Sequence, residues 1–301
     1  MWKPRWARPS QPDRKTVAER LSRALPPLLL KAEQLAKSFN PGTHGRRRAG
    51  SGEVFWQFRQ YEQDDPVDKI DWRQSAKRDQ VFIRQKEHET SESVWFWTDT
   101  GPDMTYASSA ARHSKGDLAC ILTLASALLL SRAGEQFALL GQGRKPATGP
   151  VAFERFSSGL LEQSQNSLQS CVSQTNLPPR ARIVLISDFL ATADHLEDII
   201  TILSGQGISG TLLHLADPAE VSLPFSGRVR FEGYDHTGPD THCTIGHVQS
   251  VRDEYMALFE SHRTRIAALA RQSGWDYLFH QTDEPEGRIL ANLYLYLQKG
   301  R

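Results

Sequence analysis

The sequence SVWFWTDTGPD, residues 93–103, joins an unbroken apolar run to an acidic loop. Residues 94–97 include no charged side chain, which is typical of a strand buried on both faces of a parallel sheet. The run ends at Asp99, and Gly101 and Pro102 then favour a loop. Open α/β sheets bind ligands at the carboxyl ends of their strands. This stretch therefore predicts both a central strand and a candidate site.

Beyond this stretch, the chain predicts alternating strands and helices. A second continuous apolar run, residues 182–187, also ends on an aspartate, Asp188. Further strands are expected at residues 136–141, 153–156, 209–216, 229–234 and 275–279, and helices at 27–39, 114–132, 159–175, 193–205, 249–273 and 284–298. The alternation favours an α/β fold, a mostly parallel sheet with helices on both faces, with the two acidic-ended strands side by side.

Three segments are expected along the chain. Residues 1–15 are basic and rich in proline, which indicates a disordered tail. Residues 16–92 are expected to form an N-terminal extension of helices and strands that packs on the main domain. Within it, alternation predicts strands near 54–61 and 79–86 and a helical turn at 71–77. Residues 93–301 are expected to form the main domain.

Bulk properties exclude several classes of protein. The net charge is +1, so no overall field favours nucleic acid or membranes. Three widely spaced cysteines indicate a reducing compartment rather than a disulfide framework. The longest apolar candidate, residues 121–130, is short for a membrane span and is interrupted by Thr123 and Ser126. We therefore expect a cytoplasmic protein without a membrane span.

The stretch around the first strand also resembles a known family. The residues that carry the resemblance are Arg59, Tyr61, Asp65, Ile70-Asp71-Trp72, Ser75 and Asp99-x-Gly101-x-Asp103. They are similar to the pattern of the bacterial von Willebrand factor A-like proteins catalogued as a domain of unknown function, which are usually encoded beside MoxR-type AAA+ ATPases. The sequence departs from that pattern where Asp64 replaces a glycine, Lys77 an arginine, and Gly101 and Asp103 two serines.

The resemblance implies a von Willebrand factor A-like, Rossmann-like domain preceded by a family-specific extension. It also implies that Asp99 and Asp188 match the first and last acidic ligands of a metal-ion-dependent adhesion site, which holds Mg²⁺. Asp103 can ligate in place of a hydroxyl, but Gly101 cannot, and Thr148 is the candidate for the middle ligand. We therefore favour a degenerate site, with Mg²⁺ as the ion that it would otherwise hold.

Two further groups of residues have both a structural and a binding interpretation. The family block is expected to be structural, with Trp72 buried against the sheet; it comprises Arg59, Tyr61, Asp65, Asp71, Trp72 and Ser75. Arg46, Arg47 and Arg48 lie in a glycine-rich loop, and they form either a solvated loop or a contact for an acidic partner.

Residues 234–247 contain nitrogen and sulfur groups that zinc can bind, in His236, His242, Cys243 and His247. A polar loop is favoured, because no helix or paired cysteine knuckle fixes their spacing. The sequence contains no Gly-x-Ser-x-Gly elbow, Walker A motif or Rossmann glycine fingerprint.

These observations favour a non-enzymatic interaction protein. By resemblance, it is an accessory partner of a MoxR-type ATPase in complex assembly or maturation. One alternative is a metal-dependent hydrolase that uses Asp99, Asp103 and Asp188. The other is a single-stranded nucleic-acid binder that uses the three arginines and nearby aromatic residues, although the near-neutral charge argues against it.

Reversing Arg46, Arg47 and Arg48 to glutamate is expected to slow association with a MoxR-type ATPase about tenfold at low salt, because charges at the rim of an interface mainly set the encounter rate. Surface-binding kinetics at two salt concentrations measure this. High salt is the control, since it screens the charges. An unchanged association rate at low salt would remove this loop from the interface.

Overall fold

The structure is a computed structural model of the chain. It describes residues 27–38, 55–61, 70, 72–76, 81–86, 93–163, 167–190, 193–232 and 242–298. The chain divides into two compact units, one made of residues 1–41 and 92–301 and the other of residues 42–91.

The larger unit is built on a five-stranded sheet in which every pairing is parallel. The strand order is β4-β3-β5-β6-β9. The strands are β3 (Ser93–Thr98), β4 (Gln136–Leu139), β5 (Arg182–Ser187), β6 (Ser209–Ala216) and β9 (Asp276–Gln281). The prediction that the two acidic-ended strands are neighbours is confirmed. Strands β3 and β5 pair directly, with Val94 opposite Arg182 and Thr98 opposite Ile186. Their carboxyl ends therefore meet at one edge of the sheet.

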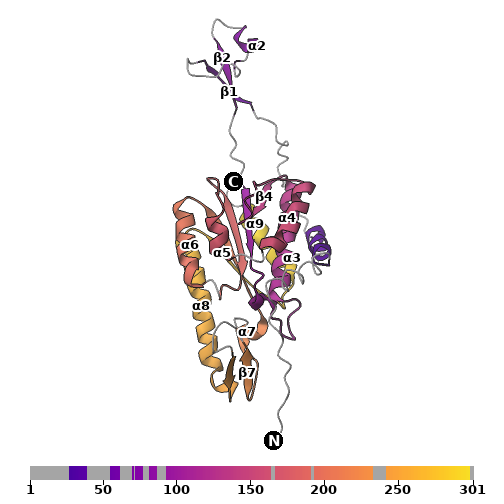
Figure 1. The fold of residues 1–301 in the computed structure, drawn as a ribbon, viewed down its shortest axis with the longest axis vertical. Coiled ribbons are helices and arrows are strands. Elements are labelled where there is room, and N and C mark those ends of the chain that lie inside the picture. Colours follow the sequence, from indigo (N-terminus) through magenta and orange to yellow (C-terminus); the bar gives the residue numbers. More distant parts are fainter. Residues whose placement is uncertain are drawn as a thin grey trace. The chain divides into compact units, whose positions relative to one another are not determined.

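Helices cover both faces of this sheet, as its continuous apolar strands require (Figure 1). One face carries the helix of residues 27–38, α3 (Lys115–Ala133), α4 (Pro150–Gln163) and α9 (Glu286–Gln298). The other carries α5 (Leu168–Ser173), α6 (Ala193–Gly205) and α8 (Arg252–Gln272). Successive β3 side chains alternate between the two cores, with Phe96 in the first and Trp95 and Trp97 in the second.

Helix α3 is the centre of the first face. Its sequence sets both ends: the Ser114 hydroxyl accepts a hydrogen bond from the Asp117 amide, and Gly134 ends the helix in the left-handed conformation at φ 75°. The helix follows the loop after β3, so it begins at the carboxyl edge of the sheet. This places its first residue, Lys115, beside the acidic loops.

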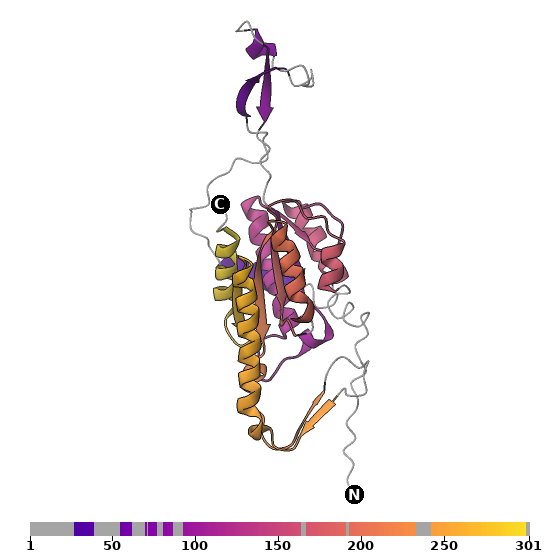
Figure 2. The same ribbon diagram turned by 90° about the vertical axis from the view of Figure 1, so that its left-hand side faces the viewer.

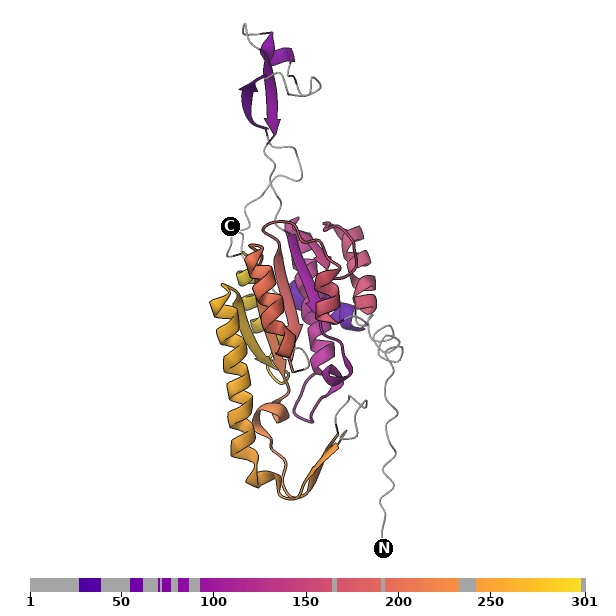
Figure 3. The same cartoon turned by 60° about the vertical axis from the view of Figure 1, so that its left-hand side comes forward.

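Four short elements follow β6. They are α7 (Pro218–Ser222), β7 (Val229–Glu232), β8 (His242–Ile245) and η3 (Val248–Ser250). Strands β7 and β8 pair antiparallel as a separate two-stranded ribbon. Figures 2 and 3 show this ribbon apart from the main sheet, near the N-terminal end of α8.

The smaller unit contains an antiparallel pair, β1 (Phe55–Gln60) and β2 (Phe82–Lys86), and the single turn α2 (Trp72–Ser75). The Ser75 hydroxyl accepts a hydrogen bond from the Phe82 amide at 2.9 Å, and the Tyr61 amide donates to the Val81 carbonyl at 2.8 Å. Trp72 is 65% exposed. Within this unit the side chain is therefore left uncovered, and its expected burial against the main sheet stays a prediction.

The expected strand at residues 153–156 is also wrong, because these residues lie in α4. Pro150 is the first residue of that helix, where its missing N–H costs nothing. Phe156 and Leu160 are buried against the core, and Phe153 packs beside them. This spacing of three and four residues is helical. The expected helix at 159–175 is likewise split between α4 and α5.

The packing of β6 against Trp275, the residue before β9, can be tested at Gly210. A Cβ at Gly210 would overlap the Trp275 ring, which is buried and held by an indole hydrogen bond to the Ile208 carbonyl. Gly210→Ala is expected to destabilise the fold by about 1–3 kcal/mol and to lower the melting temperature by several degrees. Gly287→Ala is the control, because a Cβ there meets nothing. Equal melting temperatures for the two variants would contradict the packing.

Candidate functional site

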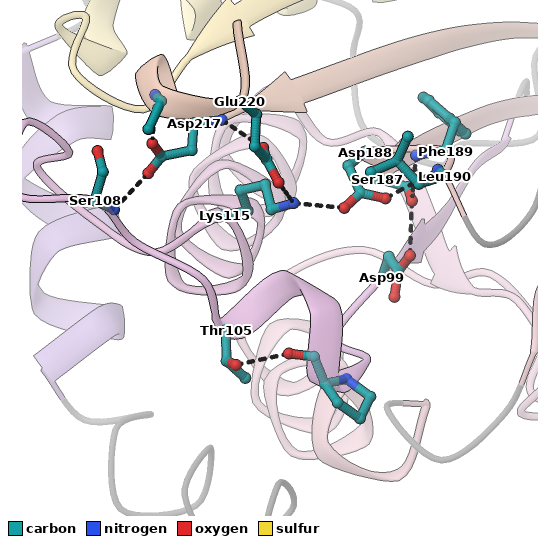
Figure 4. Close-up of polar contacts among 12 residues, drawn as sticks. Asp99, Thr105, Ser108, Lys115, Ser187, Asp188, Phe189, Leu190, Asp217 and Glu220 are labelled. Carbon is teal, nitrogen blue, oxygen red and sulfur yellow. Dashed lines mark hydrogen bonds and ion pairs between the residues drawn. The ribbon is translucent and has the colours of Figure 1, made fainter. Parts of the chain in front are cut away.

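The carboxyl ends of β3 and β5 bring Asp99 and Asp188 together at one edge of the sheet (Figure 4). The Asp99 amide donates to the Ile186 carbonyl at 2.8 Å, and the Ser187 hydroxyl donates to Asp99 Oδ2 at 2.7 Å. The two loops after these strands are thus joined through backbone and side chain. This edge is the candidate functional site.

The loop after β3 is shaped by its own aspartate. Asp99 Oδ1 accepts a hydrogen bond from the Gly101 amide at 2.9 Å, so both carboxylate oxygens have partners. A Cβ at Gly101 would lie 3.1 Å from Asp99 Oδ1, so a larger residue there would crowd this turn. The 3-10 turn η2 (Pro102–Thr105) follows and carries Asp103 in its first turn. Burial raises the pKa of Asp99 despite the hydrogen bonds from Ser187 and Gly101.

Asp188 is held by a buried lysine. Lys115 Nζ donates to Asp188 Oδ2 at 2.6 Å and to Glu220 Oε1 at 2.5 Å. We call these three residues the Lys115 triad. The exposed fractions of Lys115 and Asp188 are 1% and 3%. Burial by itself would lower the pKa of Lys115, but the charges of Asp188 and Glu220 outweigh it, so the pKa lies above its ordinary value. The lysine is therefore an ammonium ion at neutral pH.

The outer carboxylate of the triad also organises the end of β6. Glu220 Oε2 accepts a hydrogen bond from the Asp217 amide at 2.8 Å, which completes a capping box at the start of α7. Asp217 Oδ2 accepts from the Ser108 amide at 2.7 Å. Burial raises the pKa of Glu220 although Lys115 opposes the shift. The triad therefore connects α3, β5 and α7, and Asp217 attaches the loop before α3 to them.

The residues of this edge do not fit a magnesium ion. Asp188 Oδ1 accepts from the Leu190 amide at 3.1 Å and its Oδ2 binds the ammonium group. Gly101 offers no side-chain oxygen. Ala147 pairs with Phe137 near the first residue of β4, so Thr148 lies at the opposite edge of the sheet from Asp99. Among the described residues, no three His, Cys, Asp or Glu side chains are grouped to hold a metal ion.

The residue after Asp188 has an unusual backbone. Phe189 adopts φ 54°, a left-handed conformation that is costly for a residue with a side chain, and its ring is fully buried. The ring packs edge-on against His214, whose Nδ1 lies 2.9 Å from the Tyr277 hydroxyl. Burial lowers the pKa of His214 to about 3, so the imidazole is neutral. Past this turn, Leu190 is 51% exposed.

The other predicted site residues lie in the smaller unit or outside the residues that the structure describes. Arg46, Arg47, Arg48, Asp65 and Asp71 lie outside the described residues, as does His236. Arg59 belongs to β1, opposite Ile83.

Two of the groups that zinc could have bound lie in the ribbon. His242 and Cys243 are successive residues of β8, so their side chains point to opposite sides of the ribbon. Both are exposed.

The partners of Asp188 were not predicted from the sequence. Lys115 is the first residue of an apolar helix, where a positive charge is unfavourable because the helix N-terminus carries a partial positive charge of its own. A lysine at this unfavourable position indicates that a carboxylate lies nearby to stabilise it. Glu220 had a weaker signal, its spacing of three residues from the capping Asp217.

Two solved structures match this chain weakly. One is a conserved hypothetical protein, BatB, from Bacteroides thetaiotaomicron, at 12% identity, with a TM-score of 0.43, covering 69% of this chain and 98% of that one. The other is an uncharacterized membrane spanning protein from Vibrio fischeri, at 13% identity, with a TM-score of 0.20, covering 69% and 97%.

The prediction of a cytoplasmic protein without a membrane span is not supported and is withdrawn, because of one apolar helix. Within the described residues, α3 is long and apolar enough to cross a membrane, with a mean hydropathy of 1.5. The hydroxyl of Thr123 does not interrupt it, because it donates to the Ala119 carbonyl of the same helix at 2.8 Å. In this fold α3 packs into the core, and 72% of its most apolar stretch is buried.

Sequence comparison finds uncharacterized proteins of Mycobacterium tuberculosis and Mycobacterium bovis that are 23% identical over 278 residues, covering 88% of this chain and 86% of each relative. Residues 57–265 match the family described as protein of unknown function DUF58. Because that match spans more than half of the chain, including most of β1, all of the later strands except β9 and every residue of the Lys115 triad, the chain belongs to the DUF58 family.

Proposed function

We propose that this protein is a non-enzymatic interaction protein with a von Willebrand factor A-like main domain. It binds its partner through the loops at the carboxyl edge, residues 99–103 and 188–190. The partner is a MoxR-type AAA+ ATPase, which the protein assists in assembling or maturing another complex. Support for the partner comes from the sequence resemblance, and support for the surface comes from the geometry of the edge.

The observation that carries the proposal is the use of the carboxylate oxygens. Each oxygen of Asp99 and Asp188 has a hydrogen-bond partner inside the protein. A general base or a nucleophile must also reach a substrate with one of these oxygens, and here each oxygen already holds a loop amide, a hydroxyl or the ammonium group. The two aspartates therefore shape the loops, and a role in presenting a surface fits them better than a role in chemistry.

Leu190 is the natural anchor of that surface. Its amide is held by Asp188, its neighbour Phe189 is fully buried, and its own side chain is 51% exposed. Apolar side chains on a rigid backbone bind with little loss of conformational entropy. Asp103 is part-exposed on the neighbouring loop and adds negative charge at the rim. A partner segment that combines an apolar pocket with basic groups would complement this edge.

The metal-dependent hydrolase is the alternative that shares these residues. It would require a divalent ion at Asp99 and Asp188, where the oxygens are already in use. Phosphoesterase activity that requires Mn²⁺ and is lost in Asp99→Asn would replace the proposal. Single-stranded nucleic-acid binding is tested by titration at two salt concentrations, because such binding weakens steeply with salt.

Leu190→Glu is expected to weaken binding to a MoxR-type ATPase at least about tenfold, because a charge would replace the anchor of the contact. Its melting temperature should stay close to that of the wild type, since the side chain is half exposed in the free protein. Titration calorimetry with the purified ATPase measures the affinity, and a thermal melt checks the fold.

Ile202→Glu is the matched control. Ile202 is 58% exposed, but it lies near the end of α6, which runs back toward the amino ends of the strands. This variant should bind like the wild type. Equal loss of affinity in both variants, or none in Leu190→Glu, would show that the partner does not dock at the carboxyl edge.

A further inference from the structure

A single buried nitrogen sits between two carboxylates at this edge. Lys115 Nζ lies 2.6 Å from Asp188 Oδ2 and 2.5 Å from Glu220 Oε1. These distances are at the long end of those between Ca²⁺ and its oxygen ligands, about 2.3–2.6 Å, and longer than those of Mg²⁺, about 2.0–2.1 Å; carboxylates are ligands of both ions. Figure 4 shows the lysine side chain reaching the carboxylates from the start of α3.

We infer that Lys115 is a built-in replacement for a divalent cation. Its ammonium group neutralises the carboxylates that a metal would otherwise bridge, and it joins α3, β5 and α7 without any ion from solution. The carboxyl edge of this protein is therefore assembled independently of metal. This holds whether or not the edge binds a partner protein.

The position of Lys115 in its helix supports this role. It is the first residue of α3, where the helix dipole disfavours a cation. The Ser114 hydroxyl already caps the same turn, so the lysine is not needed to satisfy a backbone group. Its side chain is 1% exposed, which is costly for an ammonium ion. The two carboxylates are the feature that accounts for a charged group at this place.

The charge balance of the triad predicts the effect of removing the lysine. With one ammonium and two carboxylates, the triad has a net charge of −1. Without Lys115, both carboxylates would face a shared space, and Asp188 is too buried for water to screen it. Such a pair must take up a proton or a cation. Lys115→Ala also clears the volume in which a cation can sit, so the variant should acquire a divalent-metal site.

The wild-type protein gives the first test. Its melting temperature should be equal in EDTA and in millimolar Mg²⁺ or Mn²⁺, and added protein should leave the electron paramagnetic resonance signal of free Mn²⁺ unchanged. A wild-type melting temperature that rises with metal, and no longer rises in Asp188→Asn, would overturn the inference.

The second test compares Lys115→Ala with Lys115→Arg. Lys115→Ala should melt below the wild type in EDTA, and millimolar Mn²⁺ should raise its melting temperature by about 5 °C or more. It should also deplete the free Mn²⁺ signal with about one site per chain, as expected for a single vacated position. Lys115→Arg keeps the positive charge, so Mn²⁺ should not raise its melting temperature and its free Mn²⁺ signal should stay unchanged. This comparison separates loss of the charge from loss of the native residue.

Folding of the alanine variant does not limit the test. If Lys115→Ala does not fold in EDTA, its refolding yield in Mn²⁺ against EDTA serves as the same measurement, and a higher yield in Mn²⁺ is expected. Equal yields, or a folded variant that leaves Mn²⁺ free, would show that Lys115 does not stand in for a metal ion.

Discussion

The ion pair between Lys115 and Asp188 is the constraint on which the carboxyl edge depends. Both groups are almost completely buried, so the attraction between them has to offset the loss of hydration of two charges. That requires close geometry, and the 2.6 Å contact provides it. Because Lys115 begins α3 and Asp188 ends β5, the pair fixes the central helix against the central strand. Glu220 extends the same constraint to the helical turn after β6.

Around this pair, the carboxylates are hydrogen-bonded to neighbouring loops. Asp99 joins its own loop to Ser187, and Asp217 holds both the start of α7 and the amide of Ser108. Within the described residues, the buried hydroxyls of Thr100 and Ser108 have no hydrogen-bond partner. The bonds of the aspartates hold the loops in place, and an ordered loop can keep the strained Phe189 turn that leaves Leu190 exposed.

The sequence predicted the sheet because its strands are local features. Residues 94–97 and 182–187 are apolar over their whole length, and nothing distant is needed to recognise them. Asp99 and Asp188 could be placed together for the same reason, since they end those strands. The strand expected at 153–156 failed because Phe153 and Phe156 are three residues apart, which is the spacing of a helix face, and both pack in the core that contains α3.

The partners of Asp188 could not be found in this way. Lys115 lies 73 residues before Asp188, and Glu220 lies 105 residues after Lys115. Only the order of the strands and the start of α3 bring them together, and no spacing in the sequence encodes that order.

The arrangement separates the groups that hold the edge together from those that it can present to a partner. Lys115 and Asp188 are buried, so a basic group arriving from outside cannot compete for Asp188 without dismantling the triad. In the proposed function, contact is made by the outer groups, Leu190 and the part-exposed Asp103. Because these outer groups contribute little to the core, they can vary with the partner while the fold is kept. A surface whose stability and recognition rest on different residues suits an interaction protein better than an enzyme, in which the same buried charges usually have to serve both.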